Sequence, residues 1–156
     1  MVKIAPFPRG TVVDAGRRLA ADWTLWLSSL LDRVNLAPYQ QQRVELSAQG
    51  AAITTTAIPT PVLSGGLYRV TYFLRITRAG TVSSSATVTI GATDNSVAYT
   101  FAFAALTGNT TATVQTGTML LRVDAATSVS YAIAYASAGA TSMQFSLDVE
   151  LEAIPG

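Results

Sequence analysis

Hydrophobic and polar residues alternate most regularly near the end of the chain, at positions 142–152. Met143, Phe145, Leu147, Val149 and Leu151 occupy every second position, and polar or acidic residues lie between them. Successive side chains of a β-strand point to opposite faces, so this period of two predicts a strand with one buried and one solvated face.

The same period recurs from residue 43 onward. Further strands are predicted at 43–47, 52–58, 67–77, 85–90, 97–105, 118–123 and 128–136, with turn-rich segments such as 64–66, 93–96 and 107–109 between them. Eight short strands are typical of an antiparallel sandwich or barrel. We therefore expect a mainly β domain, an eight-stranded antiparallel sandwich or jelly roll.

A helical period precedes the β region. Apolar residues recur at three- and four-residue spacing, at Leu19, Trp23, Trp26, Leu27, Leu30, Leu31 and Val34. Asp14 or Thr11 can cap the start of this helix, and Pro38 prevents its continuation soon after Asn35. The pattern predicts one amphipathic helix, and the proline-containing segment 1–10 before it predicts an extended arm.

These patterns divide the chain into an N-terminal arm and helix (1–36), a linker (37–42) and a β-sandwich domain (43–156). The apolar stripe of the helix requires a cover, because each aromatic side chain can bury about 150–250 Å². Two interpretations stay open. The stripe packs on the sandwich or on the same helix of neighbouring subunits, or it docks on another protein.

Several predicted strands carry small residues opposite their large ones. Alanine, serine and threonine alternate with aromatic and aliphatic residues in 97–105 and 128–136. Such smooth faces suit close packing between subunits. In 67–77 both faces carry large side chains, because Leu67 and Phe73 lie opposite Tyr68, Val70, Tyr72, Leu74 and Ile76. We therefore expect this strand to be buried on both sides, at or near a subunit interface.

The low charge of the chain points in the same direction. Charged residues make up 12% and hydrophobic residues 49%, with a mean hydropathy of +0.36, whereas soluble domains carry about 25% charged residues. No apolar segment approaches the roughly 20 residues of a membrane-spanning helix, so we expect no membrane partner. Contact with other copies of the chain would cover the apolar surface, and we expect a homo-oligomer.

The composition also limits the chemistry. The chain has no cysteine and no histidine, which excludes thiol nucleophiles, histidine bases and the usual transition-metal sites. A net charge of +1 with scattered basic residues does not indicate nucleic-acid binding. We therefore expect no enzyme activity, no catalytic residues, no metal site and no cofactor.

Four sequence features resemble functional motifs but have simpler interpretations. The carboxylates Asp148, Glu150 and Glu152 share one strand face and could bind calcium or act as an acid pair, yet a solvated face is the preferred interpretation. Segment 94–96 lacks the length of a calcium loop and predicts a turn. Gly65-Gly66 precedes a strand instead of a helix, so it cannot form a phosphate-binding loop and also predicts a turn. The glycosylation pattern at 109–111 is explained by chance.

Three segments carry a family resemblance: Gly66-Leu67-Tyr68-Arg69-Val70, Asp124-Ala125-Ala126-Thr127-Ser128-Val129 and Met143-Gln144-Phe145-Ser146-Leu147. Over about residues 42–151 the chain resembles trimeric jelly-roll heads of the complement and tumour-necrosis-factor type. It is more similar to the small β-domains of tailed-bacteriophage virion proteins. The resemblance implies a homotrimer with exposed loops at one end. The segment 105–118 departs from the animal proteins.

The leading hypothesis is a non-enzymatic virion protein of a tailed phage, a homotrimeric decoration or short-fibre protein, assembled in the bacterial cytoplasm. The N-terminus, with Lys3 and the Pro6–Arg9 segment, does not resemble a secretory signal. The candidate anchoring and interface residues are Phe7, Trp23, Trp26, Leu27, Leu30, Leu67 and Phe73. Expected partners are copies of the chain and other capsid or tail proteins. The alternatives are a receptor-binding fibre tip, with a host receptor or glycan as partner, and a carbohydrate-binding module that stacks sugars on Tyr99, Tyr131 and Tyr135.

Overall fold

The computed structural model of the chain describes residues 23–27, 42–59 and 63–154. The chain divides into two units, residues 1–38 and 39–156, and the division falls inside the segment that we interpreted as a linker. In the first unit, residues 23–27 are helical, within the predicted helix. The predicted arm and the other positions of that helix lie outside the described residues.

The described helical turn separates its side chains as an amphipathic helix does. Trp23, Trp26 and Leu27 are half-buried, whereas Thr24 and Leu25 are exposed. The two tryptophan rings meet edge to face with their centroids 5.8 Å apart. Trp23, Thr24, Trp26 and Leu27 therefore agree with the faces predicted from the sequence, whereas the prediction assigned the exposed Leu25 to neither face.

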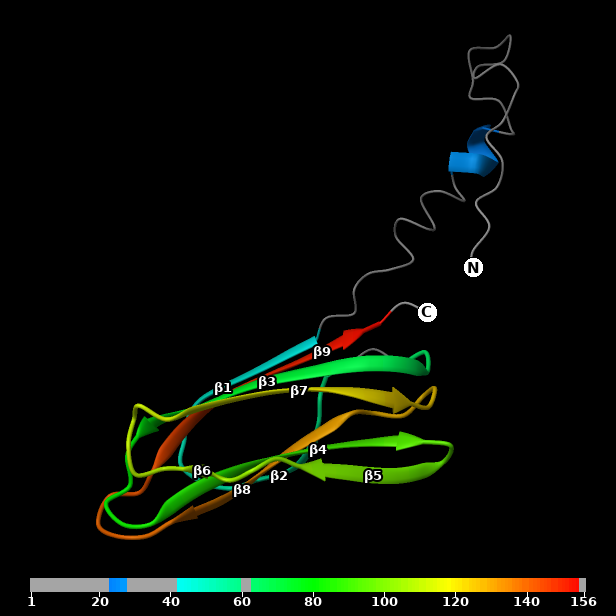
Figure 1. Cartoon of the computed structure of the whole chain (residues 1–156). Helices are drawn as coiled ribbons and strands as arrows, with labels where there is room; N and C mark the ends of the chain where they lie inside the picture. Colours follow the sequence, from blue (N-terminus) through cyan, green and yellow to red (C-terminus); the bar gives the residue numbers. More distant parts are fainter. Residues whose placement is uncertain (1–22, 28–41, 60–62, 155–156) are drawn as a thin grey trace. The chain divides into compact units, whose positions relative to one another are not determined.

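The second unit contains nine described strands. They are β1 (Gln42–Gln49), β2 (Ile53–Ala57), β3 (Gly66–Arg78), β4 (Ser84–Asp94), β5 (Val97–Ala102), β6 (Leu106–Thr107), β7 (Val114–Val123), β8 (Ser130–Ser137) and β9 (Gln144–Ala153). One sheet has the order β1-β9-β3-β7 and the other the order β2-β8-β4-β5, with β6 also paired to β4 (Figure 1). All pairings between the described strands are antiparallel. The prediction of a mainly β, antiparallel sandwich is confirmed.

The strand count of eight was wrong by one short strand. The strand predicted at 97–105 ends at Ala102, and β6 follows, where Leu106 pairs with Ala86 and Thr107 with Ser85. A two-residue strand cannot display a period of two. Its pairing depends on the neighbouring β4, which lies some 20 residues earlier in the chain, so the local pattern gave no sign of it.

The inner faces of the two sheets form one core. Its buried members on the four central strands are Tyr68, Val70, Tyr72, Leu74, Ile76, Ala86, Val88, Ile90, Ala92, Tyr131, Ile133, Phe145, Leu147, Val149 and Leu151. In β9 the alternation is the predicted one, because the four apolar residues are at most 1% exposed and the residues between them are half-buried. Burial of this kind contributes about 1.5–3 kcal/mol per large side chain.

The strand β3 differs from its prediction in one respect. Its inward residues from Tyr68 to Ile76 are buried as expected, but Leu67 and Phe73 are each 42% exposed on the outer face. Among the described residues of the second unit, the strand is therefore buried on one side only. Bulky side chains on both faces indicated burial on both, but no element of the described second unit covers the outer face of this sheet.

Candidate functional site

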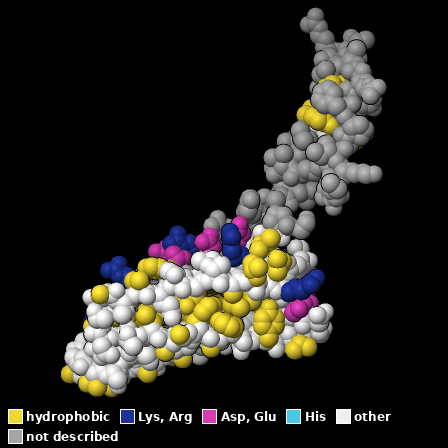
Figure 2. All heavy atoms as spheres, in the orientation of Figure 1, with side chains coloured by type: hydrophobic (Ala, Val, Ile, Leu, Met, Phe, Trp, Pro, Cys, Tyr) yellow, Lys and Arg dark blue, Asp and Glu magenta, His cyan; other side chains and the backbone are white. Residues whose placement is uncertain are grey.

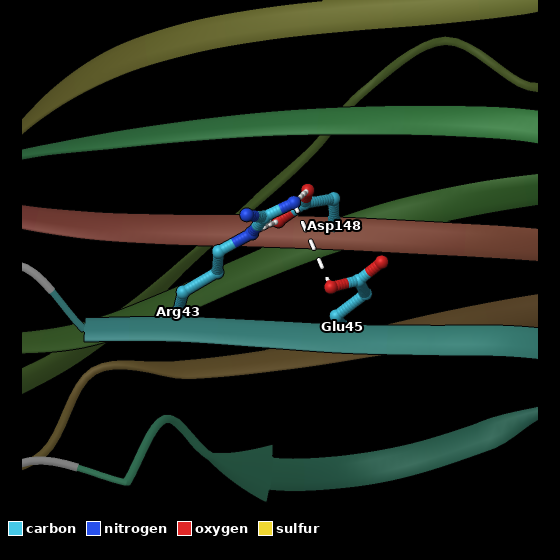
Figure 3. A network of polar contacts seen from close by, with 3 residues as sticks. All are labelled: Arg43, Glu45 and Asp148. Atoms are coloured by element: carbon cyan, nitrogen blue, oxygen red, sulfur yellow. Dashed lines mark hydrogen bonds and ion pairs between the residues drawn. The ribbon is translucent and has the colours of Figure 1, made fainter.

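The outer face of the β1-β9-β3-β7 sheet carries the carboxylate row. Asp148 accepts hydrogen bonds from Arg43 Nε at 2.8 and 3.0 Å, and Arg43 Nη2 forms an ion pair with the same carboxylate (Figure 3). Glu152 is paired in the same way with Arg69, whose Nε lies 3.1 Å from Oε2. Two of the three carboxylates are thus neutralised by arginines of adjacent strands.

The register explains why Arg43 is needed at this position. Glu45 of β1 lies directly opposite Asp148 of β9, a like-charge pair that is unfavourable in a sheet. Arg43 reaches diagonally to Asp148 and lies 3.7 Å from the Glu45 carboxylate. The hydrogen bond to Asp148 and the attraction of Asp148, Glu45 and Glu150 raise the pKa of Arg43 above its usual value. The guanidinium is therefore paired with Asp148 and Glu45, and it also attracts Glu150.

Polar and charged side chains line a hollow on this face. This hollow, about 380 Å³, is lined by Arg69, Thr71, Thr118, Glu150 and Glu152. In the described ranges, no group of three or more acidic residues is arranged to hold a metal ion.

The segment 94–96 forms a tight hairpin turn between β4 and β5, as predicted. Asn95 and Ser96 have φ values of 50° and 63°, the positive angles of a two-residue hairpin loop. Asp124 accepts hydrogen bonds from both backbone N–H groups, at 3.0 and 2.7 Å. The Asp124 carboxylate therefore stabilises the β4–β5 loop.

Asn109, in the pattern associated with glycosylation, also has a structural contact. Its side-chain amide donates to the carbonyls of Gly80 and Val82, and its oxygen accepts from Ser84 N–H at 3.3 Å. These bonds connect the β6–β7 loop to the start of β4.

The predicted turn at Gly65 is likewise present, with a φ of 73° that favours glycine.

The three tyrosines considered for sugar stacking point mainly into the sandwich. Tyr131 is 5% exposed, and Tyr99 and Tyr135 are partly buried against the core. Tyr99 donates its hydroxyl to the Arg122 carbonyl at 2.9 Å, and Tyr135 donates to the Met143 carbonyl at 2.7 Å. Their rings are not a flat exposed platform, which disfavours the carbohydrate-binding alternative.

The side of the sandwich where β5 and β7 end their sheets is apolar and partly open. Val97 and Phe101 of β5 are 65% and 49% exposed at this open side. Val114 and Leu120 of β7 are 52% and 59% exposed, but they lie on the outer face of their sheet, opposite Arg75 and Arg69 of β3. Hydrophobic side chains gather over this side of the molecule in Figure 2. We call Val97 and Phe101 the edge patch.

An aromatic cluster lies beneath the edge patch. Phe103, half-buried, lies 4.9 Å from the Phe101 ring and 4.6 Å from the Tyr72 ring, measured between centroids. Gln115 of β7 donates its amide to the Ala104 carbonyl at 3.0 Å, which holds the two edges together. The alternation in 97–105 correctly grouped Phe101 with Phe103, but it gave no sign that β5 is an edge strand and leaves Phe101 half in solvent.

The outer face of the β2-β8-β4-β5 sheet is made of small residues. Alternation with the buried residues places these side chains outward: Ser85, Thr87, Thr89, Thr93, Ala98, Thr100, Ala102, Ser130, Ala132, Ala134 and Ala136. We call this set the face patch. Asp94, at the end of β4, is the single charged residue in the described strands of this sheet. The small faces that the sequence predicted in 97–105 and 128–136 therefore join into one uncharged surface.

The predicted interface residues fall into separate places. Leu67 and Phe73 lie on the outer face of β3, beside the charged side chains, and Trp23, Trp26 and Leu27 lie on the helical turn of the other unit. Phe7 and Leu30 lie outside the described residues. The edge patch was missed at the sequence level, although the complete lack of charge between residues 95 and 121 was a usable signal.

Comparison with known proteins identifies no family: no protein-family model matches the chain, and no curated protein sequence matches it significantly. The helical turn at 23–27, the one helix in the described ranges, is too short to span a bilayer.

Proposed function

We propose that this chain is a non-enzymatic structural protein, a homotrimeric decoration or short-fibre subunit of a tailed-bacteriophage virion. The observation that carries the proposal is the combination of an uncharged sheet face with an open apolar edge on the same sandwich. Apolar surface of this extent marks contact sites between proteins. A subunit of a closed assembly buries such surface, whereas a monomer leaves it in water.

The strand order supports a jelly roll within this proposal. Apart from the short β6, the described part of the chain has eight strands, divided as β1-β9-β3-β7 and β2-β8-β4-β5. Successive strands change sheets at nearly every connection, and two four-stranded antiparallel sheets result. Double-sheet jelly rolls are common in viral capsid and lectin domains. This argument is one of fold analogy, and it favours a binding or structural module without specifying the particle.

The N-terminal unit would attach the subunit to other capsid or tail proteins. Trp23 and Trp26 supply two aromatic side chains outside the sandwich, and buried aromatic residues often dominate interface energies. Within this proposal Phe7, Leu27 and Leu30 belong to the same anchor.

Native mass spectrometry of the full chain tests the assembly, and the expected species is a trimer, three times the 16.3 kDa of one chain. A stable monomer would contradict the proposal. The virion assignment is tested by cosedimentation of the chain with phage particles purified from the cells that produce it. Absence from the purified particles would leave an oligomer without a virion role and would end that assignment.

Attachment is tested with variants of the first unit. Deletion of residues 1–35 should leave a folded β domain, seen by circular dichroism, that no longer joins particles. Trp23→Ala and Trp26→Ala should weaken attachment by at least about 2 kcal/mol each. Thr110→Ala, in the β6–β7 loop, is the matched control and should bind as wild type. If the truncated chain binds particles at full occupancy, the anchor lies in the sandwich.

A further inference from the structure

We propose that the free edge of β5 pairs with β5 of a second copy of this chain, antiparallel and centred on Thr100. The β2-β8-β4-β5 sheets of the two copies then join into one continuous sheet. This contact has two-fold symmetry, so it is separate from the contacts that would close the proposed homotrimer. In that assembly it would join copies that belong to two different trimers.

The backbone of β5 has donors and acceptors to offer. β5 pairs only with β4 in the described part of the chain, and it forms the border of its sheet (Figure 1). Residues of an antiparallel strand alternate between those that bond to the neighbouring strand and those whose N–H and C=O groups point away from it. The two-residue loop closes with Asp94 opposite Val97, and the Phe103 N–H donates to the Val88 carbonyl at 2.9 Å, which together define this alternation. The groups that point to the free edge are therefore those of Ala98, Thr100 and Ala102.

β5 is the least protected of the described strands at the sheet edges. Such strands are usually protected from pairing by charged residues, proline or bulges. β1 carries Arg43 and Glu45, β7 carries Arg122, and the pairing of β2 shifts its register between Ile53 and Thr56. The sequence of β5, VAYTFA, contains neither charge nor proline, and its pairing with β4 is regular. An added strand therefore meets no obstacle at this edge.

The sequence of β5 is complementary to its own reverse, which selects a second copy as the occupant. Tyr99 and Phe101 lie one residue to either side of Thr100, and Ala98 and Ala102 lie two residues to either side. Antiparallel pairing about Thr100 places alanine opposite alanine, tyrosine opposite phenylalanine, and Thr100 opposite its own copy. Aromatic pairs and threonine pairs across strands are favourable. A two-fold contact requires this self-complementarity, because both partners use the same surface.

The same pairing would cover the edge patch. Val97 and Phe101 are 65% and 49% exposed, and they alternate onto the face of β5 that carries Tyr99, which packs against the core. In the paired strands Phe101 lies opposite Tyr99 of the second copy, and Val97 lies opposite its Phe103. Removal of this apolar surface from water adds to the backbone hydrogen bonds. A single strand pair is nevertheless a small contact compared with the roughly 1,200–2,000 Å² of a stable interface, so it should form at higher concentrations than the trimer.

The test uses the two-fold axis, because residue 100 would face its own copy. Thr100→Lys and Thr100→Glu each place two like charges opposite one another and should weaken the association at least about tenfold. An equimolar mixture of the two variants should associate again, because a lysine then faces a glutamate. Sedimentation velocity of the full chain at rising concentrations measures the association.

Three further variants separate strand pairing from other effects. Thr100→Pro removes an N–H group that points to the free edge and leaves the bonds to β4 in place, so it should fold and lose the association. Thr100→Val keeps this N–H group and the size of the side chain and should associate as wild type. Thr55→Lys adds a charge at an exposed position of β2, at the opposite edge of the same sheet, and should also associate as wild type. Circular dichroism checks that each variant is folded.

The outcomes distinguish this inference from the proposed function. A wild-type chain that forms trimers and nothing larger at any soluble concentration would overturn the pairing and preserve the trimer. A monomer–dimer equilibrium that Thr100→Lys abolishes would support the pairing and overturn the trimer, and a monomer at all concentrations would overturn both. Wild-type association in Thr100→Pro would place the contact away from the β5 edge. Loss of association in both charged variants without recovery in their mixture would overturn the pairing of β5 with itself.

Discussion

In the β1-β9-β3-β7 sheet, acidic and basic side chains occupy many of the outward positions, and five of them form ion pairs. In the β2-β8-β4-β5 sheet, alanine, serine and threonine occupy the outward positions. The inward positions of both sheets are equally apolar and equally buried. One protein domain therefore presents two outer faces of opposite character on a common core. A sandwich of this size needs only one apolar face per sheet for folding.

The difference between the outer faces must then have a cause other than folding. A solvated outer sheet is served by charged residues, which keep it soluble and block unwanted strand pairing. The small uncharged face has no such protection, and its composition fits a surface that is covered in the assembled protein. The comparison is consistent with the proposed assembly, in which the uncharged face would be covered.

The largest expected effect tests whether the two inner faces are equivalent. Phe145→Ala in β9 should lower the free energy of unfolding by about 3–5 kcal/mol, and Ile133→Ala in β8 by about 2–5 kcal/mol, because both residues are at most 1% exposed. Denaturant titration followed by circular dichroism at one fixed chain concentration measures both. Ser146→Ala, on the outer face beside Phe145, should change little. A loss for only one sheet would show that the core is not shared.

A smaller effect is expected where the two sheets meet at their open side. A Cβ at Gly117 of β7 would lie 2.3 Å from Tyr72 Cε1 and 3.0 Å from Phe103 Cε1. Tyr72 is 2% exposed and cannot move aside freely. Gly117→Ala should therefore cost about 1–3 kcal/mol through overpacking. Thermal unfolding measures this loss. Thr118→Ala, one residue further along β7 and facing outward, is the control. Equal shifts of the unfolding temperature in the two variants would contradict this account.

The sequence was sufficient for the elements that depend on local pattern. The alternation in 143–151 identified β9 and its buried face, and the turn residues at 94–96 marked the β4–β5 hairpin. Both signals arise from residues adjacent in the chain. The classification as an antiparallel sandwich followed from the number and spacing of such segments.

The sequence was insufficient where the outcome depends on strand order. Periodicity groups Phe101 with Phe103 but cannot show that β5 lies at an edge, since that depends on pairing with β4 alone. It grouped Leu67 and Phe73 as a second bulky face without indicating what lies over them. The charge difference between the sheets also became visible only after the strands were assigned to their sheets.

The hydroxyl of Tyr99 links the edge strand of the uncharged sheet to the edge strand of the charged one. Tyr99→Phe removes its hydrogen bond to the Arg122 carbonyl and should cost about 1 kcal/mol at neutral pH, measured by denaturant titration. The pH dependence provides a second test. Burial, followed by repulsion from Asp94, raises the pKa of Tyr99.

A raised pKa in the folded state means that the unfolded chain loses this proton first. The contribution of Tyr99 is fully present below the unfolded pKa of about 10 and is lost as the pH rises from there through the folded pKa. The stability difference between wild type and Tyr99→Phe should therefore narrow in alkaline solution. Burial also raises the pKa of Tyr72, so the Tyr99→Phe variant should still lose some stability there. A difference that widens above a pH of about 10 would contradict the assignment.

The smallest expected effect separates the two outer faces directly. Arg43→Gln leaves Glu45 and Asp148 opposed across β1 and β9 with no cation between them. The loss of stability should be small at low salt, because exposed ion pairs contribute little, and it should shrink in about 1 M salt, where the screening length falls to about 3 Å. Arg75→Gln, at an arginine without an ion pair in the described residues, controls for the change in net charge. Thr87→Ala on the uncharged face should show no salt dependence. Denaturant titrations at two salt concentrations measure all three variants, and equal salt responses for Arg43→Gln and Thr87→Ala would remove the electrostatic distinction between the sheets.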